Sequence, residues 1–90
     1  MGVLVLPRAW GQMTKSLYTG RHERLCKLLL EAREKRGLTQ MAVSKKLGRP
    51  QSFVSKYESG QRRLDVIEFL EVAAVLGIDP SRFVNRLRKS

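Results

Sequence analysis

Residues 51 to 63 carry amide, hydroxyl and cationic side chains at spacings that would place several of them on one edge of a helix. If Val54 and Tyr57 face a core, the helical step of about 100° per residue turns a polar set of side chains outward. That set is Ser52, Ser55, Lys56 and Ser59. Gln51 opens the same segment, and an amide can pair bidentately with adenine while serine hydroxyls bond to several bases. The pattern therefore favours contact with the base edges of duplex DNA.

Charge is both abundant and unevenly distributed. The 90 residues include 18 Lys and Arg against 8 Asp and Glu, which gives a formal net charge of +10. Residues 39–63 sum to +5, from Lys45, Lys46, Arg49, Lys56, Arg62 and Arg63 against Glu58. Residues 64–79 sum to −4, from Asp65, Glu68, Glu71 and Asp79. Cations concentrated around one segment favour binding to phosphates. A membrane role is not expected, because no long helix is predicted that combines a basic face with a broad apolar face.

The same inventory argues against catalysis. It offers no Ser/His/Asp set and no glycine loop that could cradle a phosphate, so we expect no enzyme and no catalytic residues. Cys26 and His22 are too few ligands for zinc, so neither a metal nor a cofactor is expected. A lone cysteine suits a reducing cytoplasm, and the apolar stretch at residues 3–6 is too short to span a membrane. We therefore expect the protein in the cytoplasm.

The elements that would position these side chains are helices. Gly2, Pro7, Gly11 and Gly20 interrupt residues 1–20, which predicts a flexible N-terminal arm. Residues 21–90 then form one domain, and its first helix starts at about Arg21, with an apolar face formed by Leu25, Leu28, Leu29 and Ala32.

Two short helices joined by a tight turn are predicted over residues 39–59. Thr39 caps a helix that starts at Gln40, Gly48 permits the turn, and Pro50 opens a third helix that ends at about Ser59. Ser44 is small enough for the two helices to approach closely. Their expected apolar seam is Val43, Leu47, Val54 and Tyr57.

Two further helices complete the domain. Asp65 and Glu68 have the spacing of a capping box for a fourth helix, and Asp79 with Pro80 opens a fifth. The apolar side of the fourth helix is predicted as Val66, Phe69, Leu70, Ala73 and Leu76.

These residues together resemble the Cro and repressor type of helix-turn-helix protein, the Xre family. The resemblance is carried by residues 38–40, by Leu47 and Gly48, by residues 51–60, and by residues 70–78, and it covers about residues 22–84. It implies an all-α, compact five-helix lambda-repressor-like domain that binds operator DNA, commonly as a homodimer. Ser44 departs from the commoner alanine, which is harmless by size.

The resemblance also implies roles for individual residues. Base contacts are expected from Gln51, Ser52, Ser55 and Lys56. Contacts to the DNA backbone are expected from Gln40, Arg49, Ser59, Gln61, Arg62 and Arg63. Gln40 would also brace Gln51, and Glu58 would form a structural ion pair with Arg33. Phe53 departs from the family's pattern as a bulky residue beside the recognition face; it either touches a thymine methyl group or shields Tyr57, and shielding is favoured.

The leading hypothesis is a transcriptional regulator that reads double-stranded DNA, with repression favoured because blocking polymerase needs no further surface. The alternative is an antitoxin-type interaction protein that binds a partner protein, such as a toxin, and regulates its own gene through the same helices. RNA remains open as a ligand, but single strands favour an aromatic stacking platform, and the polar edge offers only Phe53.

Overall fold

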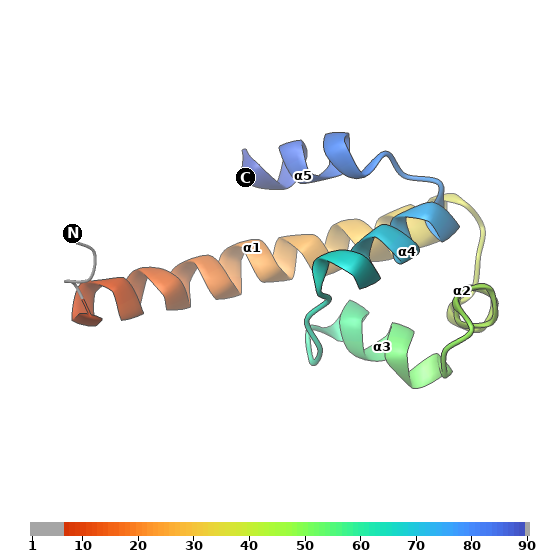
Figure 1. The fold of residues 1–90 in the computed structure, drawn as a ribbon, viewed down its shortest axis with the longest axis horizontal. Coiled ribbons are helices and arrows are strands. Elements are labelled where there is room, and N and C mark those ends of the chain that lie inside the picture. Colours follow the sequence, from red (N-terminus) through yellow and green to blue (C-terminus); the bar gives the residue numbers. More distant parts are fainter. Residues whose placement is uncertain (1–6, 90) are drawn as a thin grey trace.

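The first helix is the longest, and the other four pack around its C-terminal half (Figure 1). The computed structural model describes residues 7–89, with side chains from Gly20 to Lys89. Within that range it contains five helices and no strand: α1 (Pro7–Lys35), α2 (Gln40–Leu47), α3 (Gln51–Ser59), α4 (Val66–Leu76) and α5 (Pro80–Arg88). The predicted all-α, five-helix fold is confirmed.

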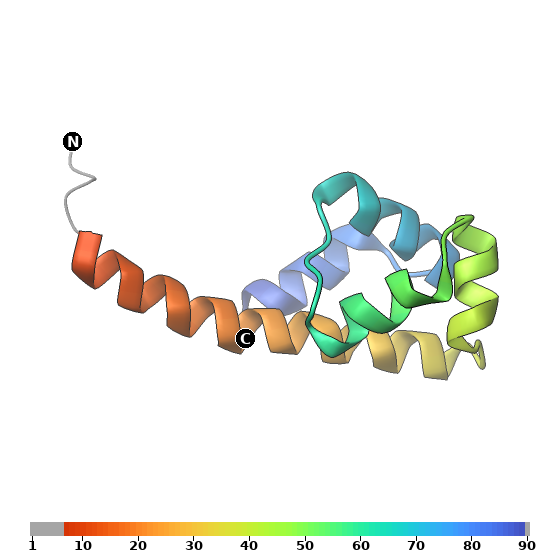
Figure 2. The same cartoon turned by 90° about the horizontal axis from the view of Figure 1, so that it is seen from below.

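The start of α1 differs from the prediction. The helix begins at Pro7, not at about Arg21, and its N-terminal half extends beyond the other helices (Figures 1 and 2). Proline suits a first helical turn, where its missing N–H is not needed, and a glycine inside a helix costs only about 1 kcal/mol relative to alanine. Gly11 and Gly20 therefore weaken this helix without ending it. Residues 1–6 lie outside the described part, and the mobility of the arm over residues 1–20 stays a prediction.

Local signals fix the ends of α2 and α3 as expected. The Thr39 hydroxyl accepts a hydrogen bond from the Ala42 amide at 3.0 Å, which caps α2. Gly48 ends it with φ of 70°, a left-handed conformation that costs glycine little because it has no Cβ. Pro50 precedes α3 as its N-cap rather than lying in its first turn, a shift of one residue.

The predicted seam between α2 and α3 is present. Val43 and Val54 have no exposed surface, Tyr57 is 1% exposed, and Leu47 packs against this core at its edge. Ser44 is also buried, and its hydroxyl donates to the Met41 carbonyl at 2.8 Å. Complete burial of one large aliphatic side chain stabilises a fold by about 1.5–3 kcal/mol. The seam therefore holds α3 at a defined angle on the rest of the domain.

The buried face of α4 was predicted only in part. Ala73 and Leu76 are buried as expected, but Val72 is the third fully buried residue, while Val66 is 71% exposed and Leu70 is 44% exposed. Apolar residues occur on every side of this helix, so periodicity alone does not choose the inward face. The capping box of Asp65 and Glu68 is confirmed. No helix in the described range is both long and apolar enough to cross a membrane.

Candidate nucleic-acid interface

The outward edge of α3 is polar, because Val54 and Tyr57 point into the core. Gln51, Ser52, Lys56 and Ser59 are exposed, and Ser55 is half-buried. The Ser59 hydroxyl donates to the Lys56 carbonyl at 3.2 Å. The four residues predicted to contact bases therefore lie at the surface of one short helix.

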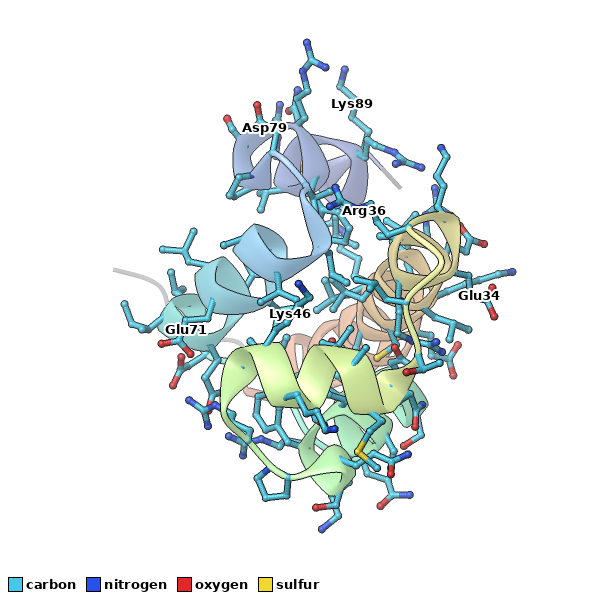
Figure 3. The ribbon with its side chains drawn as sticks, turned by 90° about the vertical axis from the view of Figure 1, so that its right-hand side faces the viewer. Glu34, Arg36, Lys46, Glu71, Asp79 and Lys89 are labelled. Carbon is cyan, nitrogen blue, oxygen red and sulfur yellow. The ribbon has the colours of Figure 1, made fainter. Side chains whose placement is uncertain are left out.

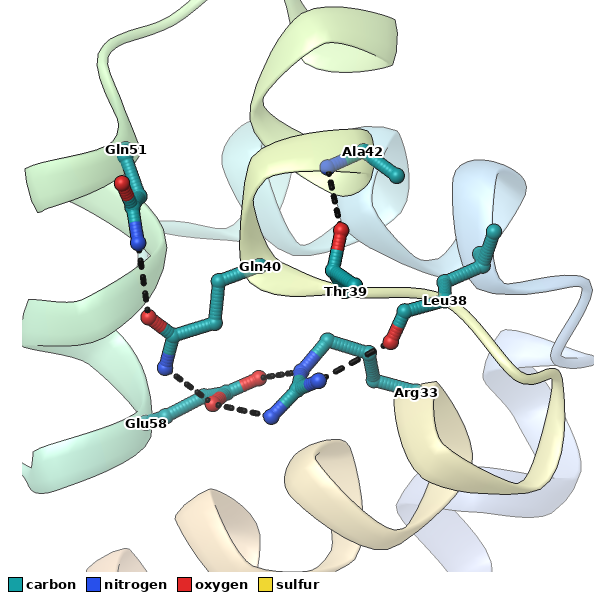
Figure 4. Close-up of polar contacts among 7 residues, drawn as sticks. All are labelled: Arg33, Leu38, Thr39, Gln40, Ala42, Gln51 and Glu58. Carbon is teal, nitrogen blue, oxygen red and sulfur yellow. Dashed lines mark hydrogen bonds and ion pairs between the residues drawn. The ribbon is translucent and has the colours of Figure 1, made fainter.

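A hydrogen-bonded network borders this edge on the side of Gln51 (Figure 4). The Arg33 guanidinium donates hydrogen bonds to both oxygens of the Glu58 carboxylate, with Nε at 2.7 Å from Oε2 and a second nitrogen at 3.2 Å from Oε1. A further Arg33 nitrogen donates to the Leu38 carbonyl at 2.9 Å. The ion pair between α1 and α3 is thus present, and its side chains are only 4% exposed for Glu58 and 12% exposed for Arg33.

The network continues through Gln40 to the predicted reader, Gln51. Because an ionised carboxylate only accepts hydrogen bonds, Gln40 must turn its NH₂ group toward Glu58, and Nε2 lies 2.8 Å from Oε1. The Gln40 oxygen is thereby directed to Gln51, whose Nε2 donates to it at 3.4 Å. This leaves the Gln51 oxygen and its second amide hydrogen for an outside partner. Hydrogen bonding to Glu58 raises the pKa of Arg33, which keeps the starting point of the network charged.

A second polar cluster borders the opposite side of the α3 edge. The guanidinium of Arg49 lies 4.6 Å from the centre of the Phe53 ring, and that of Arg62 lies 5.0 Å from it. Both arginines also bond to acids of α4. Arg62 is hydrogen-bonded to Glu68, and Arg49 approaches Glu68 at 3.6 Å and Glu71 at 3.4 Å. Two of the predicted phosphate ligands are therefore partly neutralised within the chain.

Sequence reasoning did not foresee this cluster. The signal that could have found it is the acidic segment, residues 64–79, which directly follows the basic one. Phe53 is 7% exposed and meets Tyr57 edge-on, with ring centres 5.6 Å apart, which agrees with its favoured role as a shield. Gln61 and Arg63, the remaining predicted backbone contacts, are exposed in the loop before α4.

Cys26 and His22 lie together on α1 beneath Gly60. The His22 ring nitrogen Nε2 is 3.9 Å from the cysteine sulfur and 3.2 Å from the Gly60 carbonyl oxygen. Burial raises the pKa of the Cys26 thiol, so the protonated form is favoured there. In the part of the chain that the structure describes, no three candidate metal ligands gather at one place.

Comparison with known proteins agrees with this architecture. Residues 29–83 match the family model described as helix-turn-helix. An XRE-family like protein from Pseudomonas syringae pv. tomato shares 47% identity over 86% of this chain and 94% of its own, with a TM-score of 0.81. A restriction-modification controller protein from Aeromonas hydrophila shares 28% identity over 74% of this chain and 96% of its own, with a TM-score of 0.67. No curated protein sequence matches the chain. The chain is therefore a DNA-binding transcription regulator that belongs to the Xre type of the helix-turn-helix family.

Proposed function

We propose that the protein represses transcription by placing α3 in the major groove of a specific duplex site. The observation that carries this proposal is the exposed polar edge of α3, with Gln51 oriented through Gln40, Glu58 and Arg33. A reader held in one orientation loses little side-chain freedom when it meets a base, which favours discrimination between sequences. Repression requires only that the bound protein block polymerase, and the proposed function needs no cofactor or catalytic group. Its site of action is the cytoplasm.

Two classes of contact are proposed. Gln51, Ser52, Ser55 and Lys56 read bases, because they occupy the exposed edge of α3. The proposed backbone contacts are Ser59 on the same edge, Gln40 on α2, and Arg49, Gln61, Arg62 and Arg63 in the loops on either side of α3. Phosphate contacts fix register and orientation on the duplex, and base contacts supply sequence preference.

The test compares a reader variant with an anchor variant on DNA selected from a random pool. Gln51→Ala should cost about 1–3 kcal/mol on the selected site and relax preference at one base pair. Arg62→Ala should weaken binding to selected and random duplexes alike, and lower the slope of log affinity against log salt by about 0.9. Equal behaviour of the two variants on both kinds of DNA would refute the assignment of reader and anchor.

We further propose that the protein binds DNA as a homodimer through the outer face of α4 and α5. Four large apolar side chains are exposed there: Val66 (71%), Ile67 (64%), Leu70 (44%) and Val84 (48%). Val66 and Val84 also border a groove of about 180 Å³, which continues inward to Leu25, Phe69 and Phe83. A monomer gains nothing from exposing this surface, whereas a symmetric contact would remove it from water.

Ile67→Lys should convert the dimer to a monomer in sedimentation experiments, because a charge would be buried at the interface. Met41→Lys is the matched control, since Met41 on α2 is also exposed, at 48%, but lies outside this face. The selected DNA site should be a palindrome whose half-sites lie about 34 Å apart, or a multiple of that. A dimer unaffected by Ile67→Lys would place the interface elsewhere.

The same apolar face supports the alternative function, an antitoxin that binds a partner protein such as a toxin. In that case the purified chain would be monomeric, and it would form a stable complex with the product of a neighbouring gene. A monomer without such a partner that still binds a palindrome would favour the regulator.

A further inference from the structure

The Phe53 cluster, made of Arg49, Phe53, Arg62 and Glu68, joins α3 to the loops on either side of it and to α4. Arg49 precedes α3, Phe53 lies in its first turn, Arg62 follows its end, and Glu68 lies in the first turn of α4. The two guanidinium groups lie over the Phe53 ring, with their central carbons at 4.6 and 5.0 Å from its centre, and both form ion pairs with the one carboxylate of Glu68. Glu68 is therefore the common attachment point of two cations.

Glu68 is itself fixed in place. Its side chain is 11% exposed, and its Oε1 accepts a hydrogen bond from the Asp65 amide at 3.1 Å in the capping box of α4. Oε2 is the atom that faces both arginines. One oxygen thus holds the carboxylate to the backbone, and the other holds the guanidinium groups.

The arginines keep a surface toward solvent beside the recognition edge. Their side chains are 35% exposed for Arg49 and 40% exposed for Arg62. Phe53 lies three positions before Lys56, so the cluster is next to Lys56 on the surface of α3. A guanidinium has five N–H donors, and a carboxylate that engages one or two of them leaves the others for phosphate.

We propose that Glu68 is a positioning residue for DNA binding, which holds Arg49 and Arg62 where their outer N–H groups meet phosphates beside α3. This deepens the proposed function and rests on it. The proposal reverses the expectation from charge alone. An acid close to DNA should repel it, so its removal should strengthen binding, whereas removal of a positioning residue should weaken it.

The test is Glu68→Gln, measured by fluorescence anisotropy on a short random-sequence duplex between about 50 and about 200 mM salt. Glutamine also serves at this position of a capping box, so the start of α4 should be retained. Glu34→Gln is the control for charge, because it raises the net charge of +10 by the same one unit. Glu34 is exposed on α1, on the side of the molecule opposite Glu71 (Figure 3).

Glu68→Gln should bind about 3- to 10-fold more weakly than the wild type, and its salt slope should fall by about 0.9 for each phosphate that the arginines no longer neutralise. Glu34→Gln should bind as tightly as the wild type or more tightly. In an Arg62→Ala background the loss caused by Glu68→Gln should be smaller, because one of the two cations that it positions is already gone. Circular dichroism and thermal melting establish that each variant is folded at the temperature of the binding measurement.

If folded Glu68→Gln binds as tightly as Glu34→Gln, or keeps the full salt slope, the proposal is wrong. An equal loss in the wild-type and Arg62→Ala backgrounds would also overturn it, since Glu68 would then not act through Arg62. Should the wild type itself fail to bind duplex DNA with a salt-dependent affinity, the proposed function would fail, and that result is separate from the first two.

Discussion

Removal of the Glu58 carboxylate should strongly destabilise the fold. In Glu58→Ala, Arg33 loses two hydrogen bonds, of 2.7 and 3.2 Å, and Gln40 loses one of 2.8 Å. The Arg33 side chain is only 12% exposed, so its charge would remain poorly hydrated and without its partner. Loss of one member of a buried ion pair costs about 3–5 kcal/mol. Small domains have a total stability of about 5–15 kcal/mol, so the variant should be close to unfolding.

Urea denaturation followed by circular dichroism measures this effect, with a lower midpoint at an unchanged slope as the expected result. Glu71→Ala is the matched control, because its carboxylate is 50% exposed and pairs with Arg49 at 3.4 Å. An exposed pair of this kind contributes about 0–1 kcal/mol.

The double variant Arg33→Met with Glu58→Leu tests whether the loss of stability in Glu58→Ala comes from the unpaired charge of Arg33 or from lost side-chain packing. It removes both charges together, so it should be more stable than Glu58→Ala despite carrying one more substitution. A cost below about 1 kcal/mol for Glu58→Ala, or a double variant less stable than the single one, would refute the reasoning about the buried charge.

Substitutions at Tyr57, Gly77 and Asp65 test other features of the fold. The Tyr57 hydroxyl is buried and has no hydrogen-bond partner among the described residues, so Tyr57→Phe should leave stability unchanged or raise it by up to about 1 kcal/mol in urea titrations. Burial also raises the pKa of Tyr57, so the phenol resists ionisation in the folded state. The stability of the wild type should therefore fall above about pH 10, where the phenol of the unfolded chain ionises. Tyr57→Phe should lose less stability over the same pH range. Gly77 has φ of 69°, and an added Cβ would meet the Arg36 guanidinium. Gly77→Ala should therefore lower the free energy of unfolding by about 1–2 kcal/mol. In a double-mutant cycle, Arg36→Ala should restore part of that loss. Asp65→Ala removes the cap of α4 and should lower the free energy of unfolding by about 1–2 kcal/mol, which is observed as a lower midpoint of thermal unfolding. Asp65→Asn should retain most of the stability that the cap provides.

Sequence patterns located the short helices because their ends depend on neighbouring residues. The Thr39 cap, the Gly48 turn and the capping box of Asp65 and Glu68 all act within about one helical turn, so residue type and spacing were sufficient. The predicted start of the first helix is wrong because proline is compatible with a first helical turn and glycine only weakens a helix.

The polar networks could be anticipated only in part. The pairing of Arg33 with Glu58, and of Gln40 with Gln51, was expected from resemblance to the family, and the spacing of those residues alone does not imply it. The Phe53 cluster was not expected at all. Its members come from α3, from the loops on either side of that helix and from α4, and their contacts form only where the fold brings these segments together.

The sequence by itself determined the number of helices after the first, the turn at Gly48 and the outward polar edge of α3, because caps, glycine conformations and helical periodicity are local properties. Only the tertiary structure decided which side of α4 is buried, since its apolar residues are not confined to one face, and which cations are held by acids rather than left to solvent. Those outcomes depend on packing between segments that are distant in the chain. Only that packing determines which side chains are buried and which acid lies close enough to each cation to pair with it.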